Sequence, residues 1–161
     1  MLHRFLVAAH DGTDGGRKDD NKPKHGNNNN SSSNGLTPPV KPVSIVRKVI
    51  IVDDVPELTD LYSRILELHG HTVAIVAHSG EELRSEANRE SLVGVDVALV
   101  DFRLGGTEDG FAVARTILRH SPPTKIVIAS ADESVRKEAS AVGFRFLKKP
   151  FTINEMLEAI M

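Results

Sequence analysis

The stretch Val49-Ile50-Ile51-Val52-Asp53-Asp54 decides the fold of this chain. Four apolar residues in a row, with no polar alternation, are typical of a strand that is covered on both faces, as in a parallel sheet. Runs of the same kind occupy residues 97–100 and 126–129, and two further apolar runs occupy residues 73–77 and 144–147. The sequence therefore predicts five short strands, three of them buried on both faces.

Helical patterns separate these strands. In the first, apolar residues between Leu58 and Leu66 recur at helical spacing and form one stripe. Pro56 suits the first turn of this helix, and Gly70 suits its exit. Capping boxes at Ser79–Glu82 and Thr152–Glu155 predict the starts of the second and fifth helices. The fourth helix has Asp132 or Ser134 as its cap. The third is indicated by an apolar stripe of Phe111, Ala114, Ile117 and Leu118.

Strand and helix thus alternate five times along the chain. Right-handed crossovers then predict an α/β fold, a doubly wound parallel sheet of five strands with helices on both faces. In such sheets, functional groups collect beyond the carboxyl ends of the strands. The residues at those ends are therefore the candidates for function.

Charged and hydroxyl side chains stand at four of the five strand ends. Asp53 and Asp54 follow the first strand, Asp101 ends the third, Ser130 ends the fourth, and Lys149 with Pro150 ends the fifth. Because the carboxyl ends of parallel strands meet at one edge of the sheet, we expect three carboxylates, one hydroxyl and one ammonium to converge there.

This set of groups predicts phosphoryl chemistry with a metal ion. Converging carboxylates repel one another, and a divalent cation relieves that repulsion. Oxygen ligands with open positions favour Mg²⁺, which also accepts phosphate oxygens, and a carboxylate beside Mg²⁺ and a lysine can attack phosphorus. We predict Asp101 as the nucleophile, Asp53 and Asp54 as metal ligands, Lys149 as a clamp on the phosphoryl group, and Ser130 as a hydrogen-bond donor to it.

Taken singly, each of these residues has a structural explanation. Asp54 can favour the positive end of the first helix, and an aspartate or serine that ends a strand is most often a turn or cap residue. Lys149 can be ordinary surface charge, and Pro150 can simply end a strand. The joint pattern, with suitable residue types in order at four strand ends, argues against coincidence.

These segments resemble the response-regulator receiver family. The matching stretches are Val49–Asp54, Val97–Gly106, Asp109–Gly110, Ile126–Ala131 and Phe146–Phe151, and the resemblance covers residues 47–161. It implies a flavodoxin-like sheet with strand order 2-1-3-4-5. It also implies a signalling phosphoacceptor in a two-component phosphorelay, which catalyses only its own phosphotransfer and dephosphorylation.

The resemblance also assigns roles at the site. A sensor histidine kinase or a His-phosphotransfer protein would phosphorylate Asp101, and the Lys149–Pro150 peptide bond would be cis. Ser130 and Phe146 fall at the family's switch positions, and we hypothesise that they couple Asp101 to the face of the fourth helix, fifth strand and fifth helix. A downstream protein, or a second copy of the chain in a homodimer formed on phosphorylation, would bind that face. The Mg²⁺ ligands would be Asp53, Asp54, Asp101 and the backbone carbonyl of Arg103.

The sequence departs from the family pattern in the loop after Asp101. This loop is one residue longer than usual and carries Gly105 where the family often has proline, which leaves the place of the Arg103 carbonyl open. The segment between the second helix and the third strand, residues 88–95, also looks slightly longer than in the family pattern. Arg103 and Asp132 each lie two residues beyond a site residue, and we expect them to border the phosphoryl group. As a pair they would either shield it from water or form a surface salt bridge of no consequence.

Composition places limits on the remainder of the chain. Residues 1–44 are rich in Asn, Ser, Gly and Pro and predict a disordered arm, which leaves 45–161 as the receiver domain. The net charge of −2 gives no broad case for nucleic acid, and the absence of cysteine excludes disulfides and thiolate metal sites. Because no apolar run is long enough to cross a bilayer, we expect a cytoplasmic protein without membrane contact. All seven histidines are interpreted as surface or tail residues.

Three other classes of function compete with this interpretation. A phosphatase that forms an aspartyl phosphate would commonly place a second acid two residues after the nucleophile, where this chain has Arg103. A nucleotide-binding module would need a glycine-rich loop after the first strand, where Asp53 and Asp54 would repel phosphates. A DNA-binding regulator would need an output domain beyond Met161. We therefore expect a stand-alone receiver.

Overall fold

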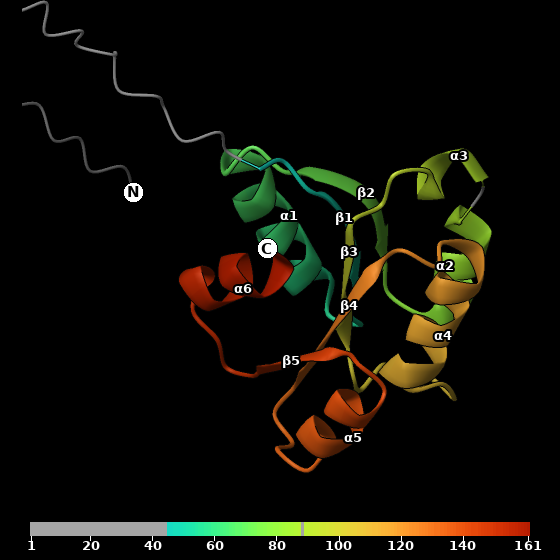
Figure 1. Cartoon of the computed structure of the whole chain (residues 1–161), viewed down its shortest axis with the longest axis vertical. Helices are drawn as coiled ribbons and strands as arrows, with labels where there is room; N and C mark the ends of the chain where they lie inside the picture. The colour runs from blue at the N-terminus through green and yellow to red at the C-terminus, as the bar shows by residue number, and fades with distance from the viewer. Residues whose placement is uncertain (1–44, 88) are drawn as a thin grey trace, which may run out of the picture. The chain divides into compact units, whose positions relative to one another are not determined.

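The computed structural model describes residues 45–87 and 89–161. The predicted arm, residues 1–44, lies outside this range. The described part contains one sheet of five parallel strands in the order β2-β1-β3-β4-β5, which confirms the predicted fold (Figure 1). The strands are β1 (Lys48–Val52), β2 (Thr72–Ala77), β3 (Val97–Asp101), β4 (Lys125–Ser130) and β5 (Arg145–Lys148).

Six helices connect and follow the strands in the described residues. They are α1 (Pro56–Leu68), α2 (Gly80–Glu86), α3 (Arg89–Leu92), α4 (Gly110–His120), α5 (Val135–Ala141) and α6 (Ile153–Ile160). Five of them are the predicted helices. The four-residue α3 was not predicted. It lies in the segment 88–95, which the sequence indicates is slightly longer than in the family pattern.

The helices cover the sheet in two layers, each with its own apolar core. One core packs Leu66 of α1 and Met156 of α6 against one face of the strands. The other packs α2, α3, α4 and α5 against the opposite face, with Leu83, Phe111 and Val135 among its members. Figure 1 shows α1 and α6 together on one side of the sheet and α2 to α4 on the other.

The apolar runs of the sequence are buried as predicted. Every residue of β3 is buried, and so is every residue of β1 and β4 except the lysine that begins each strand. The fifth strand begins one residue later than predicted, at Arg145, and the ring of Phe144 just before it stacks on Phe111 of α4. The buried central strands β1, β3 and β4 are those whose carboxyl ends carry the aspartates and Ser130.

The predicted helix ends are partly confirmed. Pro56 begins α1, Gly70 follows its end with a φ of 83°, and Thr152 forms a capping box with Glu155. The box at Ser79 is only half formed. Ser79 Oγ accepts from the Glu82 amide, but the Glu82 carboxylate bonds to His78 instead of the Ser79 amide. Before α5, Asp132 Oδ1 accepts from the amide and hydroxyl of Ser134, while the Ser134 side chain caps nothing.

Gly110 fixes the distance between the start of α4 and the end of β3. A Cβ at this position would lie 2.9 Å from Phe102 Cα and nearer still to the carbonyl oxygen of Asp101. Both are backbone atoms and cannot rotate away, so a side chain here would push α4 off the strand that carries Asp101.

Among the described residues, no helix is long and apolar enough to span a membrane.

We predict that Gly110→Ala destabilises the domain by about 1–3 kcal/mol, the usual cost of an overpacked site. Urea unfolding would measure it. Gly106→Ala is the matched control, because a Cβ there would meet no atom within 4 Å. Equal unfolding midpoints for the two variants would contradict the close approach.

Candidate functional site

Three aspartates and one lysine converge beyond the carboxyl ends of β1, β3 and β5. Lys149 Nζ donates to Asp53 Oδ2 at 2.6 Å and pairs with Asp101 Oδ1 at 2.8 Å. Oxygen atoms of Asp53, Asp54 and Asp101 lie within 4.8 Å of one another, and they form the one group of possible metal ligands among the residues described. Four predicted site residues are thus brought together, although they lie far apart in the chain.

Burial and charge shift the pKa values of Asp101 and Lys149. Asp53 and Asp101 are buried, whereas Asp54 is exposed. Desolvation by burial raises the pKa of the Asp101 carboxyl, and the charges of Asp53 and Asp54 raise it further, while Lys149 opposes both. Burial works against the charged form of Lys149, but its bonds to Asp101 and Asp53 outweigh that effect and raise its pKa. The ammonium is therefore held charged between two carboxylates.

The local backbone directs the two acids that follow β1. The Asp53 amide donates to the carbonyl of Ala77 in β2 at 3.2 Å, and Asp53 Oδ1 accepts from the Val55 amide at 3.1 Å. Asp54 Oδ2 accepts from the amide of Gly105 at 3.0 Å. The proline frequent in the family at this position has no such amide hydrogen, so this contact requires a residue other than proline there. The unusual loop is thereby tied to one of the three acids.

The two residues predicted at switch positions lie on β4 and β5. Ser130 is buried, its carbonyl accepts from the Lys149 amide at 2.9 Å, and its hydroxyl accepts from the Asp132 amide at 3.1 Å. Phe146 is half-buried, and the guanidinium carbon of Arg136 lies 4.5 Å from the centre of its ring. The peptide bond between Lys149 and Pro150 is cis. This bond lies where the chain leaves β5 for α6.

The pair predicted to border the phosphoryl group is also present. Arg103 Nη2 lies 3.5 Å from Asp132 Oδ2, and both side chains are substantially exposed. Their contact bridges the loop after β3 and the loop after β4. The role of the Arg103 carbonyl as a metal ligand stays a prediction.

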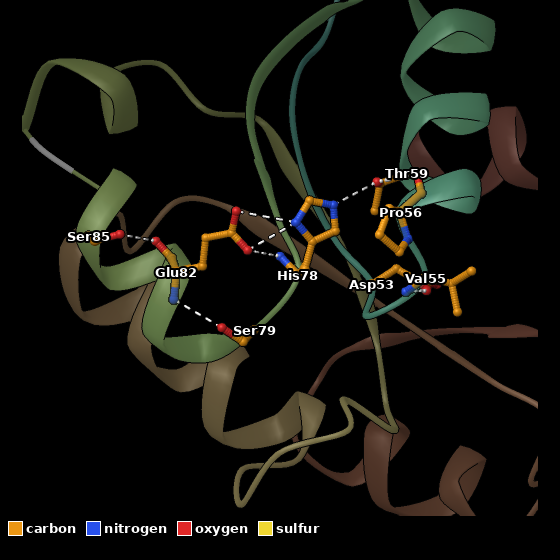
Figure 2. Close-up of polar contacts among 8 residues, drawn as sticks. All are labelled: Asp53, Val55, Pro56, Thr59, His78, Ser79, Glu82 and Ser85. Carbon is orange, nitrogen blue, oxygen red and sulfur yellow. Dashed lines mark hydrogen bonds and ion pairs between the residues drawn. The ribbon is translucent and has the colours of Figure 1, made fainter.

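Sequence reasoning missed two residues near the site. The histidines were interpreted as surface residues, but His78 is half-buried and its ring lies between Glu82 and Thr59 (Figure 2). Tyr62 falls within the apolar stripe between Leu58 and Leu66, and no role at the site was predicted for it. Its ring lies 5.4 Å from that of Phe151. Burial raises the pKa of the Tyr62 hydroxyl, and the charges of Asp53 and Asp101 add to this effect while the charge of Lys149 opposes it. No local signal marked either residue, because both contacts join distant parts of the chain.

The donor set fits a hard divalent cation. The three carboxylates offer oxygen ligands only, and one of them is open to solvent, so water and a phosphate oxygen can complete the coordination of Mg²⁺. No thiolate or imidazole belongs to the group among the described residues, which argues against a zinc site of the usual kind.

Residues 49–161 match the family model of the response regulator receiver domain. The chain therefore belongs to this family, and it is a phosphoacceptor receiver domain of two-component signalling. Receiver domains as a class bind Mg²⁺ in an acidic pocket and interact with histidine kinases and downstream effectors. The fold and the acid cluster agree with this family, and nothing in them favours a phosphatase.

Similar proteins include whole transcriptional regulators. The transcriptional regulatory protein TrcR of Mycobacterium tuberculosis is 29% identical over 113 residues, which cover 68% of this chain and 42% of TrcR. The nitrogen assimilation regulatory protein NtrX of Azorhizobium caulinodans is 28% identical over 114 residues, which cover 68% of this chain and 24% of NtrX. The chain thus spans less than half of these relatives.

Solved structures share the fold. The chemotaxis protein CheY4 of Vibrio cholerae has a TM-score of 0.60 at 24% identity, with 72% of this chain and 97% of CheY4 covered. The CheX–CheY–BeF3–Mg²⁺ complex of Borrelia burgdorferi has a TM-score of 0.62 at 22% identity, with 71% and 87% covered. The receiver domain of a modulated diguanylate cyclase from Desulfovibrio desulfuricans has a TM-score of 0.59 at 28% identity, with 72% and 91% covered.

We predict that Asp101→Asn stabilises the domain at neutral pH. Because the folded-state pKa of Asp101 is raised, this group contributes stability below its unfolded pKa and loses it as the pH rises through the folded pKa. The advantage of the variant should therefore shrink as the pH falls into the range where Asp101 is protonated. Urea unfolding without Mg²⁺ between acidic and neutral pH would measure it, and a pH-independent difference would contradict it.

Proposed function

We propose that Asp101 accepts a phosphoryl group from a phosphohistidine of a sensor histidine kinase or a His-phosphotransfer protein. The observation that carries this proposal is the placement of one lysine ammonium between two buried carboxylates, with a third carboxylate beside them. Lys149 favours the ionised form of Asp101 against the effect of burial, and it puts a positive charge where a phosphoryl oxygen would arrive.

The transfer is a displacement at phosphorus. An Asp101 carboxylate oxygen forms a new bond to phosphorus while the bond from phosphorus to the imidazole nitrogen breaks. The electron pair of that bond goes to the histidine nitrogen, which takes up a proton. The donor returns to a neutral histidine, and Asp101 becomes an aspartyl phosphate.

The remaining residues divide the charge of the transferred group. Lys149 pairs with one phosphoryl oxygen, and the Ser130 hydroxyl donates to another. Asp53 and Asp54, with Asp101 and the backbone carbonyl of Arg103, would hold Mg²⁺, which neutralises negative charge on the phosphoryl oxygens when it is bound. We propose that this set serves only the chain's own phosphotransfer and dephosphorylation, and that the chain is not an enzyme toward other substrates.

The phosphorylated state is proposed to bind a partner through the face formed by α5, β5 and α6. A groove on this face is lined by Arg136, Ser140, Phe146 and Glu158, among others. Phe146 is part of this groove and pairs with Ile128, two residues before Ser130 in β4. A movement of Ser130 toward the phosphoryl group can therefore change the groove. The partner would be a downstream protein or a second copy of the chain.

We predict that the protein takes up one phosphoryl group from acetyl phosphate in the presence of Mg²⁺. Intact mass should show a single phosphate addition in the wild type, none in Asp101→Asn, and a much reduced yield with EDTA. The control Asp132→Asn keeps all three clustered acids and should still be modified. Modification of Asp101→Asn at the wild-type level would place the acceptor elsewhere.

We predict that Arg103→Ala shortens the lifetime of the aspartyl phosphate. The Arg103–Asp132 contact spans the two loops beside Asp101, so its loss opens a path for water. Because both side chains are exposed, we expect a change of only about two- to fivefold in the decay rate. Decay of the phosphorylated mass after removal of acetyl phosphate would measure it. An unchanged rate would identify the pair as a surface salt bridge without a role in hydrolysis.

A further inference from the structure

A hydrogen-bonded bridge crosses the carboxyl end of the edge strand β2 (Figure 2). His78, the first residue after β2, has Nδ1 3.0 Å from Glu82 Oε2 and Nε2 3.2 Å from Thr59 Oγ1. Glu82 belongs to α2 and Thr59 to α1, and these helices pack on opposite faces of the sheet. The imidazole therefore ties the two layers together next to the end of β1, where Asp53 leaves the sheet.

Both ends of the bridge are held firmly. The Glu82 carboxylate also accepts from the His78 amide at 2.7 Å, and Thr59 is fully buried, with its hydroxyl 2.9 Å from the Pro56 carbonyl. A neutral ring can donate from Nδ1 to Glu82 and accept the Thr59 hydroxyl hydrogen at Nε2. A charged ring donates at both nitrogens, and the hydroxyl then donates to Pro56. The bridge persists in either protonation state.

The bridge reaches the acidic pair through the first turn of α1. The Thr59 amide donates to the Val55 carbonyl at 3.2 Å, and the Val55 amide donates to Asp53 Oδ1 at 3.1 Å. On its other side, His78 follows Ala77, whose carbonyl accepts from the Asp53 amide at 3.2 Å. The loop that carries both acids is therefore connected to the bridge on two sides.

We propose that His78 is a positioning residue for the cation site. Through Thr59 it holds the first turn of α1 against α2, and it thereby keeps Asp53 and Asp54 in the arrangement that binds Mg²⁺. His78 acts through Thr59 and not as a ligand, since the metal-binding group of the described residues contains only the three aspartates. The inference rests on the proposed function, because Mg²⁺ binding and phosphoryl transfer are what this positioning serves.

The chain carries its own spectroscopic reporter for the test. It has one tyrosine and no tryptophan, and Tyr62 lies on α1 within the electrostatic reach of Lys149, Asp53 and Asp101. Titration of the purified full chain with MgCl₂, followed by tyrosine fluorescence, therefore reports on the site itself.

The decisive comparison is Thr59→Val against Thr59→Ser. Valine keeps the buried shape but removes the hydroxyl, and we expect its Mg²⁺ dissociation constant to rise about three- to tenfold, the value of one ordinary hydrogen bond. Serine keeps the hydroxyl and should bind Mg²⁺ like the wild type. Rescue by serine distinguishes positioning through the hydroxyl from a general loss of packing.

A second variant and a matched control complete the test. His78→Phe keeps a planar ring at a half-exposed position but removes both nitrogens, and it should weaken Mg²⁺ binding as Thr59→Val does. Thr116→Val is the control, because Thr116 is also a buried helical threonine whose hydroxyl bonds to a carbonyl of its own helix, Ala112. It should leave Mg²⁺ affinity unchanged.

Phosphorylation by acetyl phosphate, measured on the same samples, distinguishes a failure of the positioning role from a failure of the proposed function. If the wild type is phosphorylated and Thr59→Val and His78→Phe bind Mg²⁺ as tightly as it does, the positioning role is wrong while the proposed function stands. A Thr59→Ser variant as weak as Thr59→Val would also overturn it. A wild type that neither binds Mg²⁺ nor accepts a phosphoryl group would overturn both.

Discussion

The ammonium of Lys149 is the charge on which the site depends. Burial and the charges of the neighbouring acids raise the pKa of Asp101, Lys149 opposes both effects, and a protonated Asp101 is a poor nucleophile. Lys149 contacts both Asp53 and Asp101 and comes from the strand at the edge of the sheet. Its reach requires β1, β3 and β5 to end at the same rim, so the strand order and the two apolar cores serve one electrostatic requirement.

The three acids are held by different means, and this division has a consequence for the cation. Asp53 is fixed by Lys149 and by the Val55 amide, whereas exposed Asp54 is bound only to the Gly105 amide among its described contacts. A cation that draws on Asp54 Oδ2 must therefore compete with the loop after β3. The Gly105 amide, which the family's frequent proline would lack, connects this loop to the site through Asp54. The two buried acids, Asp53 and Asp101, are held within the domain.

Two chains of contacts connect the site to the rest of the domain. Toward β5, the Ser130 carbonyl bonds to the Lys149 amide and the strand continues to Phe146, whose ring is covered by Arg136. Toward β2, the loop of Asp53 meets the bridge of His78 between α1 and α2. The first direction leads to the groove proposed for partners. The second is a rigid connection between helix layers, suited to holding a geometry rather than to changing it.

The sequence by itself determined the strands, the order of the chemistry along them and the four groups that cluster. Strand ends are local features, and in a parallel sheet they share one rim, so Asp53, Asp54, Asp101 and Lys149 could be placed together without coordinates. Only the tertiary structure decided the contacts of His78 and Gly105. These contacts join residues 19 and 51 positions apart across loops whose paths no periodic pattern encodes. The structure also showed that the Glu82 carboxylate bonds to His78 instead of closing the capping box at Ser79.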